Sequence, residues 1–297
     1  MLEFKKLTLD DISRLKPYFS YSYNRICDNT VGGAFMWRDF FCVEFAEYDD
    51  TVIFKAQVTY HENVTAFAPP LGKEFLECVE KIVEYCRFHG LEIIFFNVTD
   101  EDIALLRKRF DRYDISKEEN WSDCLYHAED LVSLAGRRFS GQRNHINYFL
   151  KMYPRFSFEV MTSSNIADVM EFFVRFSSAT SKDSRIFVEE NKKTVEVLEN
   201  FDVYGMVGGL LRLDGAVIAF SLGEVINDVL FIHVEKADLQ YRGAYQVINN
   251  EFARHFCFEG VRFVNREEDV GDEGLRISKK SYHPCKIIDK YIMMCFL

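Results

Sequence analysis

Apolar and polar residues follow two different periods along this chain, and the clearest change of period lies between residues 228 and 258. Residues 230–232 are apolar without interruption, which is typical of a strand buried on both faces. After a turn that contains Gly243, apolar residues recur about every four positions, as on one face of a helix. They are Ala244, Val247, Ile248, Phe252 and Phe256. The pattern predicts a buried strand, a tight turn and an amphipathic helix.

An internal repeat divides the chain into two similar halves. The spacing Phe4-Thr8-Ile12-Leu15-Phe19 recurs as Phe158-Thr162-Ile166-Val169-Phe173, at an offset of 154 residues. Later in each half, residues 80–97 and 249–265 both read as a helix, a glycine stop and a buried strand. The repeat predicts two α/β units. We place the first in residues 1–137, a linking helix in residues 138–156, and the second unit in residues 157–297.

Short antiparallel strands are expected within each half. Residues 43–46 and 52–55 flank Asp49-Asp50, and residues 210–213 and 216–220 flank Asp214-Gly215, which is a hairpin signal. Thr8 with Asp11, and Thr99 with Asp102, have the spacing of capping boxes at helix starts. The predicted fold class is therefore α/β with two domains, each a mixed, mostly antiparallel sheet flanked by helices.

Composition excludes several classes of protein. The chain has 297 residues, is 48% hydrophobic and carries a formal net charge of −11, so it can bury a large core but is no general nucleic-acid coat. Its eight cysteines include no C-x-x-C pair, so no metal site is predicted. The first residues lack the apolar core of a signal peptide, and no apolar run approaches the ~20 residues of a membrane span. We expect a cytoplasmic protein.

One basic segment interrupts this acidic chain. Residues 131–158 contain no Asp or Glu. They contain five cations, which are Arg137, Arg138, Arg143, Lys151 and Arg155. Either these cations pair with acidic surfaces of the protein, or they form a basic wall for an anion such as a phosphate, an RNA terminus or a lipid headgroup.

The turn before the predicted helix has the features of an anion site. Backbone N–H groups at a helix start, with little side-chain bulk at Gly243, suit a diphosphate. Gln240-x-x-Gly243-x-Tyr245 resembles the Q/R-x-x-G-x-G/A loop of GNAT acyltransferases, which holds the pyrophosphate of coenzyme A; Tyr245 departs from that pattern. We expect this turn at the surface, with the donor bound on the second half only. The expected cofactor-binding residues are Val234, Gln240, Tyr241, Arg242, Gly243, Ala244, Tyr245 and Asn265.

Longer segments resemble the DUF2156 family, which is similar to the C-terminal domain of bacterial phosphatidylglycerol lysyltransferases. They are HVEKAD (233–238), INNEF (248–252), NREEDVGDEGLR (265–276), KKSYHP (279–284) and YHAEDLVSLAGRRFSGQRNHINYF (126–149). The resemblance spans nearly the whole chain. It implies two tandem GNAT-like domains and a transferase whose donor is acyl-CoA or aminoacyl-tRNA.

Three residues are candidates for proton transfer. Alternate residues of a strand share a face, so we expect His233 and Glu235 to point together and to serve as bases. Tyr282 stands where GNAT enzymes often carry a general acid. Each also has a structural interpretation, as a core histidine, an ion-paired glutamate or a core tyrosine. The candidate substrate-binding residues are Glu267 and Asp269 in an acidic loop, Arg276 and Lys279 on a helix, and Arg143.

Three functions remain open from the sequence. The first is an acyltransferase that moves an acyl group from acyl-CoA, its cofactor, to a small-molecule or peptide amine. The second uses aminoacyl-tRNA as the donor and a phospholipid or peptide as the acceptor. The third is a non-catalytic protein that binds coenzyme A or another anion.

Overall fold

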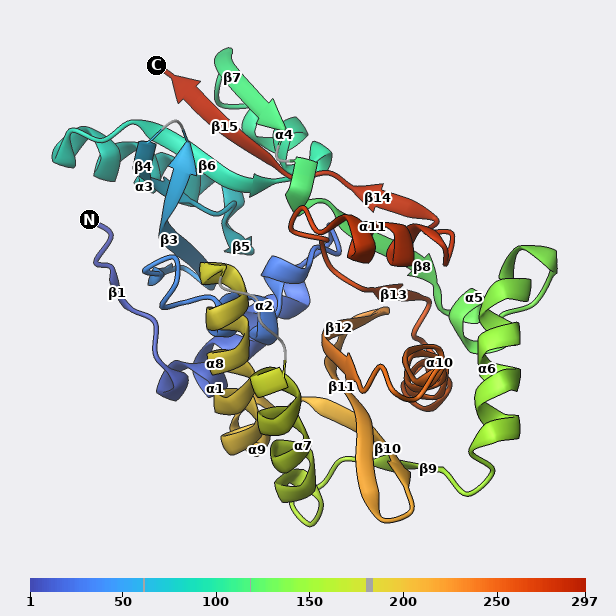
Figure 1. The fold of residues 1–297 in the computed structure, drawn as a ribbon. Coiled ribbons are helices and arrows are strands. Elements are labelled where there is room, and N and C mark those ends of the chain that lie inside the picture. The colour runs from blue at the N-terminus through green and yellow to red at the C-terminus, as the bar shows by residue number, and fades with distance from the viewer. Residues whose placement is uncertain (61, 118, 180–183) are drawn as a thin grey trace. The chain divides into compact units, whose positions relative to one another are not determined.

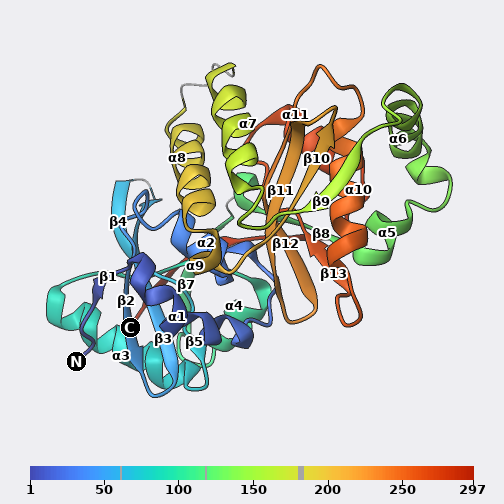
Figure 2. The same cartoon turned by 90° about the horizontal axis from the view of Figure 1, so that it is seen from below.

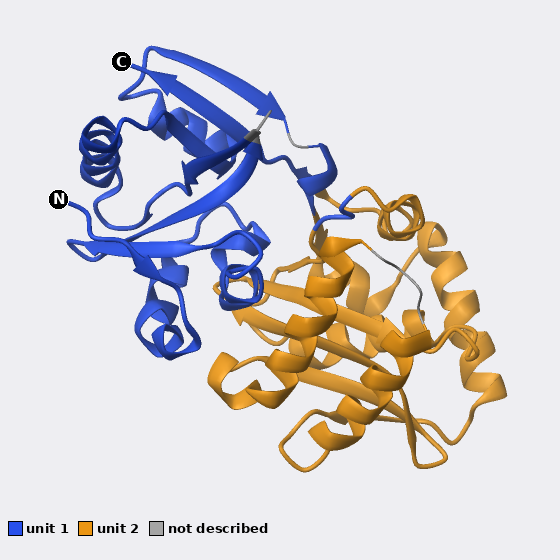
Figure 3. Ribbon diagram, turned by 60° about the vertical axis from the view of Figure 1, so that its left-hand side comes forward, with its two compact units in different colours: residues 1–123, 268–270, 287–297 blue, residues 124–267, 271–286 orange. Residues whose placement is uncertain are grey.

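The computed structural model describes residues 1–60, 62–117, 119–179 and 184–297, and divides into two compact units (Figure 3). Unit 1 comprises residues 1–123, 268–270 and 287–297; unit 2 comprises residues 124–267 and 271–286. Each unit contains one mixed sheet flanked by helices, which confirms the predicted fold class. Among the described residues, no helix has both the length and the hydropathy that a membrane span requires.

Eight strands form the sheet of unit 1. They are β1 (Lys5–Lys6), β2 (Glu44–Tyr48), β3 (Thr51–Tyr60), β4 (Glu62–Phe67), β5 (Leu71–Gly72), β6 (Ile93–Val98), β7 (Arg112–Lys117) and β15 (Tyr291–Phe296). Seven follow the order β1-β2-β3-β4-β6-β15-β7, and β5 pairs with β3. β4 and β6 run parallel, and the other pairs run antiparallel.

The helix α3 (Phe75–His89) makes the crossover between β4 and β6. Its apolar stripe packs into the core of unit 1, as its sequence period predicts; the buried residues are Cys78, Val79, Ile82, Val83 and Cys86. The helix ends at Gly90, whose φ of +65° is the left-handed conformation that favours glycine. The other α-helices described in unit 1 are α1 (Ile12–Leu15), α2 (Val31–Met36) and α4 (Asp100–Leu106).

Seven strands form the second sheet, which lies in unit 2 except for Asp123, Ile287 and Ile288, residues of β8 and β14 that the division assigns to unit 1. They are β8 (Asp123–His127), β9 (Ser157–Val160), β10 (Val207–Leu213), β11 (Ala216–Ile226), β12 (Val229–Ala237), β13 (Phe263–Asn265) and β14 (Lys286–Ile288). Their order is β14-β8-β13-β12-β11-β10-β9. β12 and β13 run parallel, with α10 (Ala244–Phe256) as the crossover between them. The strand, turn and helix predicted in residues 228–258 are therefore confirmed.

Helices lie against both faces of the unit 2 sheet. α10 covers one face, where its predicted stripe is buried, and α7 (Ile166–Ala179) covers the other with α8 (Arg185–Glu199) (Figure 2). α6 (Ser140–Met152) lies beyond α10 and falls within the segment predicted as a linking helix (Figure 1). The remaining described α-helices of unit 2 are α5 (Ala128–Ser133), α9 (Phe201–Tyr204) and α11 (Glu273–Lys280).

The two sheets have the same strand order, as the internal repeat predicts. In each, four strands form an antiparallel meander, a helix crosses over to a parallel fifth strand, and two further strands complete the sheet. The sixth strand has a different origin in each sheet. It is β15, from the C-terminus, in unit 1, and β8, from the middle of the chain, in unit 2.

This exchange changes the domain boundaries from those expected in the sequence. β8 was placed in the first domain but pairs with β13, and β15 was placed in the second but pairs with β6 and β7. Strand pairing depends on backbone hydrogen bonds between residues far apart in the chain, so sequence separation does not predict it.

Unit 1 should depend on the strand that the C-terminus contributes. Met293 of β15 is fully buried in its core, so Met293→Ala should lower the free energy of unfolding of unit 1 by about 2–5 kcal/mol. Urea denaturation followed by fluorescence of Trp37 and Trp121, both in unit 1, measures this loss. The control Met294→Ala, at a half-buried neighbour, should lose less; equal losses would contradict the assignment of β15 to this core.

Candidate active site

A β-bulge in β12 controls where the candidate catalytic residues point. The register between β11 and β12 shifts after Leu222, so that Leu222 faces Val234, Gly223 faces Ile232, and His233 is the extra residue. Gly223 permits the close approach, because a Cβ there would lie 2.1 Å from the carbonyl oxygen of Phe231. The bulge turns Glu235 toward α10 and leaves His233 on the face covered by α7 and α8.

The expectation that His233 and Glu235 point together is therefore wrong. Alternation along an unbroken strand would place them on one face, and an inserted residue reverses the alternation beyond it. Glu235 accepts a hydrogen bond from Asn249 of α10, whereas Lys236, its neighbour, pairs with Glu190 of α8. The sequence pattern gives no sign of this bulge apart from Gly223.

On the α10 face, Glu235 is the centre of a buried polar group that we call the Glu235 cluster, made of Ser221, Glu235, Asn249 and Arg266. Its carboxylate accepts from Asn249 Nδ2 at 2.9 Å and pairs with Arg266 Nη2 at 3.1 Å. Ser221 is the cross-strand partner of Glu235. The ladder between β12 and β13 ends at Phe231 and Asn265, so the part of β12 that carries Glu235 has a strand neighbour on the β11 side only.

Three atoms of the Glu235 cluster are buried without a hydrogen-bond partner among the described residues. They are Ser221 Oγ, Asn249 Oδ1 and Arg266 Nη1. Such an atom costs about 1–3 kcal/mol each, and native proteins rarely leave several together. The Arg266 nitrogen is a hydrogen-bond donor, the Asn249 oxygen is an acceptor, and the Ser221 hydroxyl can be either. All three belong to residues that pair with Glu235 or lie opposite it in the sheet. This arrangement fits a polar ligand that would complete the missing hydrogen bonds.

Tyr282 lies beside this cluster. The Arg266 guanidinium lies 4.8 Å from the centre of the Tyr282 ring and 5.9 Å from that of the Tyr126 ring. The Tyr126 hydroxyl donates to the Lys279 carbonyl at 2.8 Å. Burial raises the pKa of Tyr282 above its ordinary value, partly opposed by Arg266. The hydroxyl therefore stays protonated at neutral pH, as a proton donor requires.

His233 lies between two carboxylates on the opposite face. Its Nδ1 is 2.6 Å from Glu267 and its Nε2 is 2.9 Å from Glu224. Burial alone would lower the pKa of His233, but hydrogen bonds to Glu224 and Glu267 raise it to about 10. With both ring nitrogens engaged and the ring cationic, His233 is poorly suited to accept a proton from a substrate.

The turn of residues 240–245 differs from the expected open anion site. The amides of Gln240 and Tyr241 donate to Asp238, and the amide of Ala244 donates to the Tyr241 carbonyl. Gly243 is buried rather than at the surface, because α6 packs over it; a Cβ would lie 2.5 Å from the His145 carbonyl oxygen. Its φ of +95° also favours glycine. Packing and backbone conformation thus explain this glycine without a diphosphate.

The remaining expected site residues do not form one group; each makes its own local contacts. Arg143 donates to the carbonyls of Leu134 and Gly136, beyond the end of α5, and Val234 is buried on the α7 face. Asn265 is buried and accepts from the Glu267 amide at 2.6 Å. Asp269 belongs to unit 1, whereas Arg276 and Lys279 lie on α11 in unit 2.

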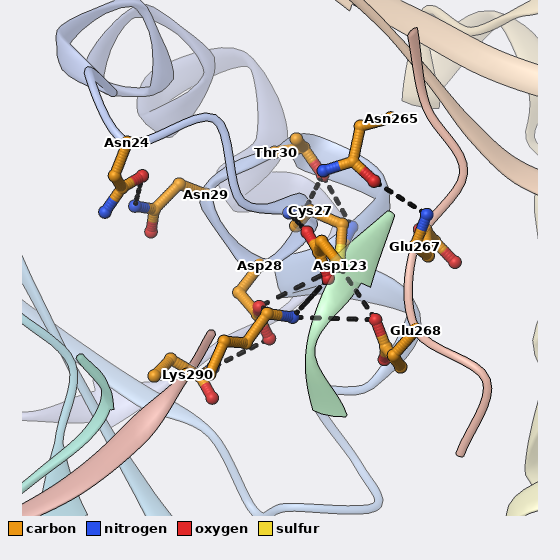
Figure 4. A network of polar contacts seen from close by, with 12 residues as sticks. Asn24, Cys27, Asp28, Asn29, Thr30, Asp123, Asn265, Glu267, Glu268 and Lys290 are labelled. Carbon is orange, nitrogen blue, oxygen red and sulfur yellow. Dashed lines mark hydrogen bonds and ion pairs between the residues drawn. The ribbon is translucent and has the colours of Figure 1, made fainter. Parts of the chain in front are cut away.

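Unit 1 contains a second buried polar group, which we call the Lys290 cluster (Figure 4). The ammonium of Lys290 lies 2.5 Å from Asp28, 2.8 Å from Asp123 and 3.5 Å from Glu268. Cys27 Sγ lies 3.4 Å from the same nitrogen. Burial alone would lower the pKa of Lys290, but Asp123 and Asp28 raise it well above its ordinary value. The Cys27, Asp123 and Glu268 ligand atoms lie within 4.8 Å of one another, and the lysine supplies the cation among them.

Sequence reasoning missed most of the Glu235 cluster. Ser221 is a polar residue inside the apolar strand β11, and Asn249 interrupts the buried stripe of α10. Polar residues at core positions were the available signal, because they need partners when buried. Which of them meet depends on the bulge and on the pairing of β13.

A family model described as phosphatidylglycerol lysyltransferase, C-terminal, matches residues 20–294 of this chain. A conserved protein of unknown function from Bacteroides thetaiotaomicron is 30% identical, with a TM-score of 0.92 and full coverage of both chains. The DUF2156 C-terminal domain of a protein assigned as a lysylphosphatidylglycerol synthetase from Agrobacterium fabrum is 16% identical, with a TM-score of 0.67. The match covers 96% of this chain and 91% of that chain. L-PGS from Bacillus licheniformis is 14% identical, with a TM-score of 0.64; the match covers 95% of this chain and 91% of that chain. The last two likenesses show a shared fold.

The His233 pKa predicts how the stability of unit 2 depends on pH. The folded pKa of about 10 exceeds the ordinary value of 6.5, so the stabilisation is complete below pH 6.5 and is lost as pH rises through 10. The free energy of unfolding should fall by at most about 1.4 kcal/mol per pH unit in this window. Measured by urea denaturation, His233→Gln should remove this dependence of the free energy of unfolding on pH, and the exposed control His255→Gln should retain it. An unchanged pH dependence in His233→Gln would contradict the pairing of His233 with Glu224 and Glu267.

The Lys290 cluster makes a separate prediction for unit 1. Lys290→Met leaves buried carboxylates without their cation and should lower the free energy of unfolding by about 3–5 kcal/mol. The control Lys117→Met removes a half-exposed pair with Asp289 and should cost at most about 1 kcal/mol. Tryptophan fluorescence during urea denaturation distinguishes the two; similar small losses would mean that Lys290 is dispensable.

Proposed function

Because the chain belongs to the phosphatidylglycerol lysyltransferase C-terminal family, we propose that it transfers an aminoacyl group from aminoacyl-tRNA to an acceptor, with the Glu235 cluster as its active site. The family supports a transferase. The choice of donor rests on the chemistry of the cluster, and the observation that carries it is the set of three unpartnered buried atoms around Glu235.

These atoms complement an aminoacyl ester. The ester has a positively charged α-amino group and, next to it, a carbonyl oxygen that gains negative charge when it is attacked. Asn249 Oδ1 and Ser221 Oγ can accept from the ammonium beside the Glu235 carboxylate. Arg266 Nη1 is a free donor for the carbonyl oxygen, and such a donor stabilises the charge that develops there. A simple acyl thioester lacks the ammonium and would leave the acceptors unpaired.

Glu235 and Tyr282 are the groups that would transfer protons in this reaction. The acceptor, a hydroxyl or an amine, attacks the ester carbonyl and loses a proton to the Glu235 carboxylate. The bond to the tRNA ribose oxygen then breaks, and that oxygen takes a proton from Tyr282. The Tyr282 hydroxyl is protonated at neutral pH, as in any tyrosine whose pKa is not lowered, and so has a proton to give. His233 has a structural role in this mechanism, between Glu224 and Glu267.

Acyl-CoA is the weaker candidate for the donor. Its diphosphate was expected at the turn of residues 240–245, where three amides donate within the chain and α6 covers Gly243. The family's description supports a lysyl group as the cargo and phosphatidylglycerol as the first acceptor to test. A peptide amine is the second.

Ser221→Ala tests the site with little risk to the fold. The substitution removes a buried hydroxyl for which the described part of the chain offers no partner, so stability should stay constant or rise by about 1 kcal/mol. Transfer should nevertheless slow by about 10–100-fold, the effect of one hydrogen bond to a charged group. The assay follows radiolabelled amino acid from aminoacyl-tRNA into phosphatidylglycerol vesicles or peptide.

Thr194→Ala is the matched control, because that buried hydroxyl donates to the Glu190 carbonyl at 2.8 Å on the other face. It should lose stability and keep its activity. Glu235→Gln should abolish transfer. Full activity in both Ser221→Ala and Glu235→Gln would place the site elsewhere; consumption of acyl-CoA instead would select the acyltransferase, and consumption of neither donor would leave a binding protein.

A further inference from the structure

We propose that the C-terminal part of α6 and the loop of residues 238–242 form a docking surface for a bilayer that contains anionic phospholipid. This surface consists of Tyr148, Lys151, Met152, Leu239 and Arg242, and we call it the α6 face. It lies in unit 2 and has no residue in common with the Glu235 cluster. The inference concerns binding alone and is independent of the donor that the active site uses.

Contacts within unit 2 make the α6 face continuous. The Arg242 guanidinium lies 4.7 Å from the centre of the Tyr148 ring, and the rings of Tyr153 and Tyr241 are 5.4 Å apart. Lys151 and Met152 follow Tyr148 by three and four residues, which places them on the same side of the helix. These two contacts therefore hold the loop against the C-terminal part of α6.

The α6 face carries both exposed apolar side chains and exposed cations. Leu239 is 82% exposed, Met152 52% and Tyr148 38%. Lys151 and Arg242 are exposed, and neither has an ion-pair partner among the residues that the structure describes. Arg155, close by in the chain, is already paired with Asp214 at 2.7 Å. In a protein of net charge −11, these two cations lie on the same face as exposed aliphatic side chains.

A lipid surface suits this combination better than RNA does. Anionic headgroups attract both cations, and the Leu239 and Met152 side chains leave water when they enter the headgroup region. RNA would use the cations but would give no apolar environment to these aliphatic groups. It would also stack bases on aromatic faces, and the ring face of Tyr148 is covered by Arg242. The charge and the apolar side chains together therefore point to an anionic membrane.

Vesicle co-sedimentation of the full chain tests the proposal without any donor. Binding should be strong for phosphatidylcholine vesicles that contain phosphatidylglycerol, weak for pure phosphatidylcholine, and weaker in high salt. Lys151→Glu with Arg242→Glu should lower the partition coefficient by roughly 30-fold or more, from about fivefold for each cation lost. Leu239→Ser, at a position too exposed to matter for folding, should lower it by roughly fivefold.

The matched control changes the same chemistry on another surface of unit 2. Val174 is 51% exposed on α7 beside Arg175, so Val174→Ser with Arg175→Glu should leave vesicle binding unchanged. Equal losses in the control and the α6 variants would mean non-specific charge attraction and would overturn the proposal. Absence of vesicle binding by the wild type would also overturn it, as would a loss confined to binding of total tRNA. Vesicle binding without any aminoacyl transfer would support the docking surface and refute only the proposed reaction.

Discussion

Buried charge is the constraint on which this structure most depends. Three consecutive residues, Arg266, Glu267 and Glu268, each pair with a different partner in the interior of their unit: Glu235, His233 and Lys290. A buried charge without a partner costs several kcal/mol, so each pair restricts how the chain can run through this segment. Arg266 and Glu267 point to opposite faces of the unit 2 sheet, because their partners, Glu235 and His233, lie on opposite faces of β12.

The β-bulge in β12 separates two kinds of buried polar group. On the α7 face, His233 is saturated by two carboxylates, and such a group stabilises the fold without reacting. On the α10 face, the Glu235 cluster retains three unpaired atoms and thus unused binding capacity. The same strand therefore carries a structural residue and a candidate catalytic residue two positions apart. Incomplete hydrogen bonding, rather than the residue types alone, distinguishes them.

The packing of α6 on the start of α10 affects two different surfaces. It buries Gly243 beneath the His145 carbonyl, which removes space where a diphosphate would approach the turn. It also places Tyr148 under the Arg242 guanidinium and so joins the helix to the loop that carries Leu239. One contact between helices thus weakens the case for coenzyme A and creates the α6 face.

The sequence by itself determined the elements and the repeated architecture, because these depend on local periodicity and on comparison of the two halves. The capping boxes of Thr8 and Thr99, the stripe of α10 and the common sheet order all follow from such patterns, and the family resemblance was also present in the residues. The tertiary structure alone decided which strand completes each sheet, since pairing joins residues such as Tyr291 and Val98 across most of the chain. It also decided that Glu235 meets Arg266 and Asn249 rather than His233. One extra residue in a strand reverses every side chain beyond it, and hydrophobic patterns do not record that reversal when both faces of the strand are buried.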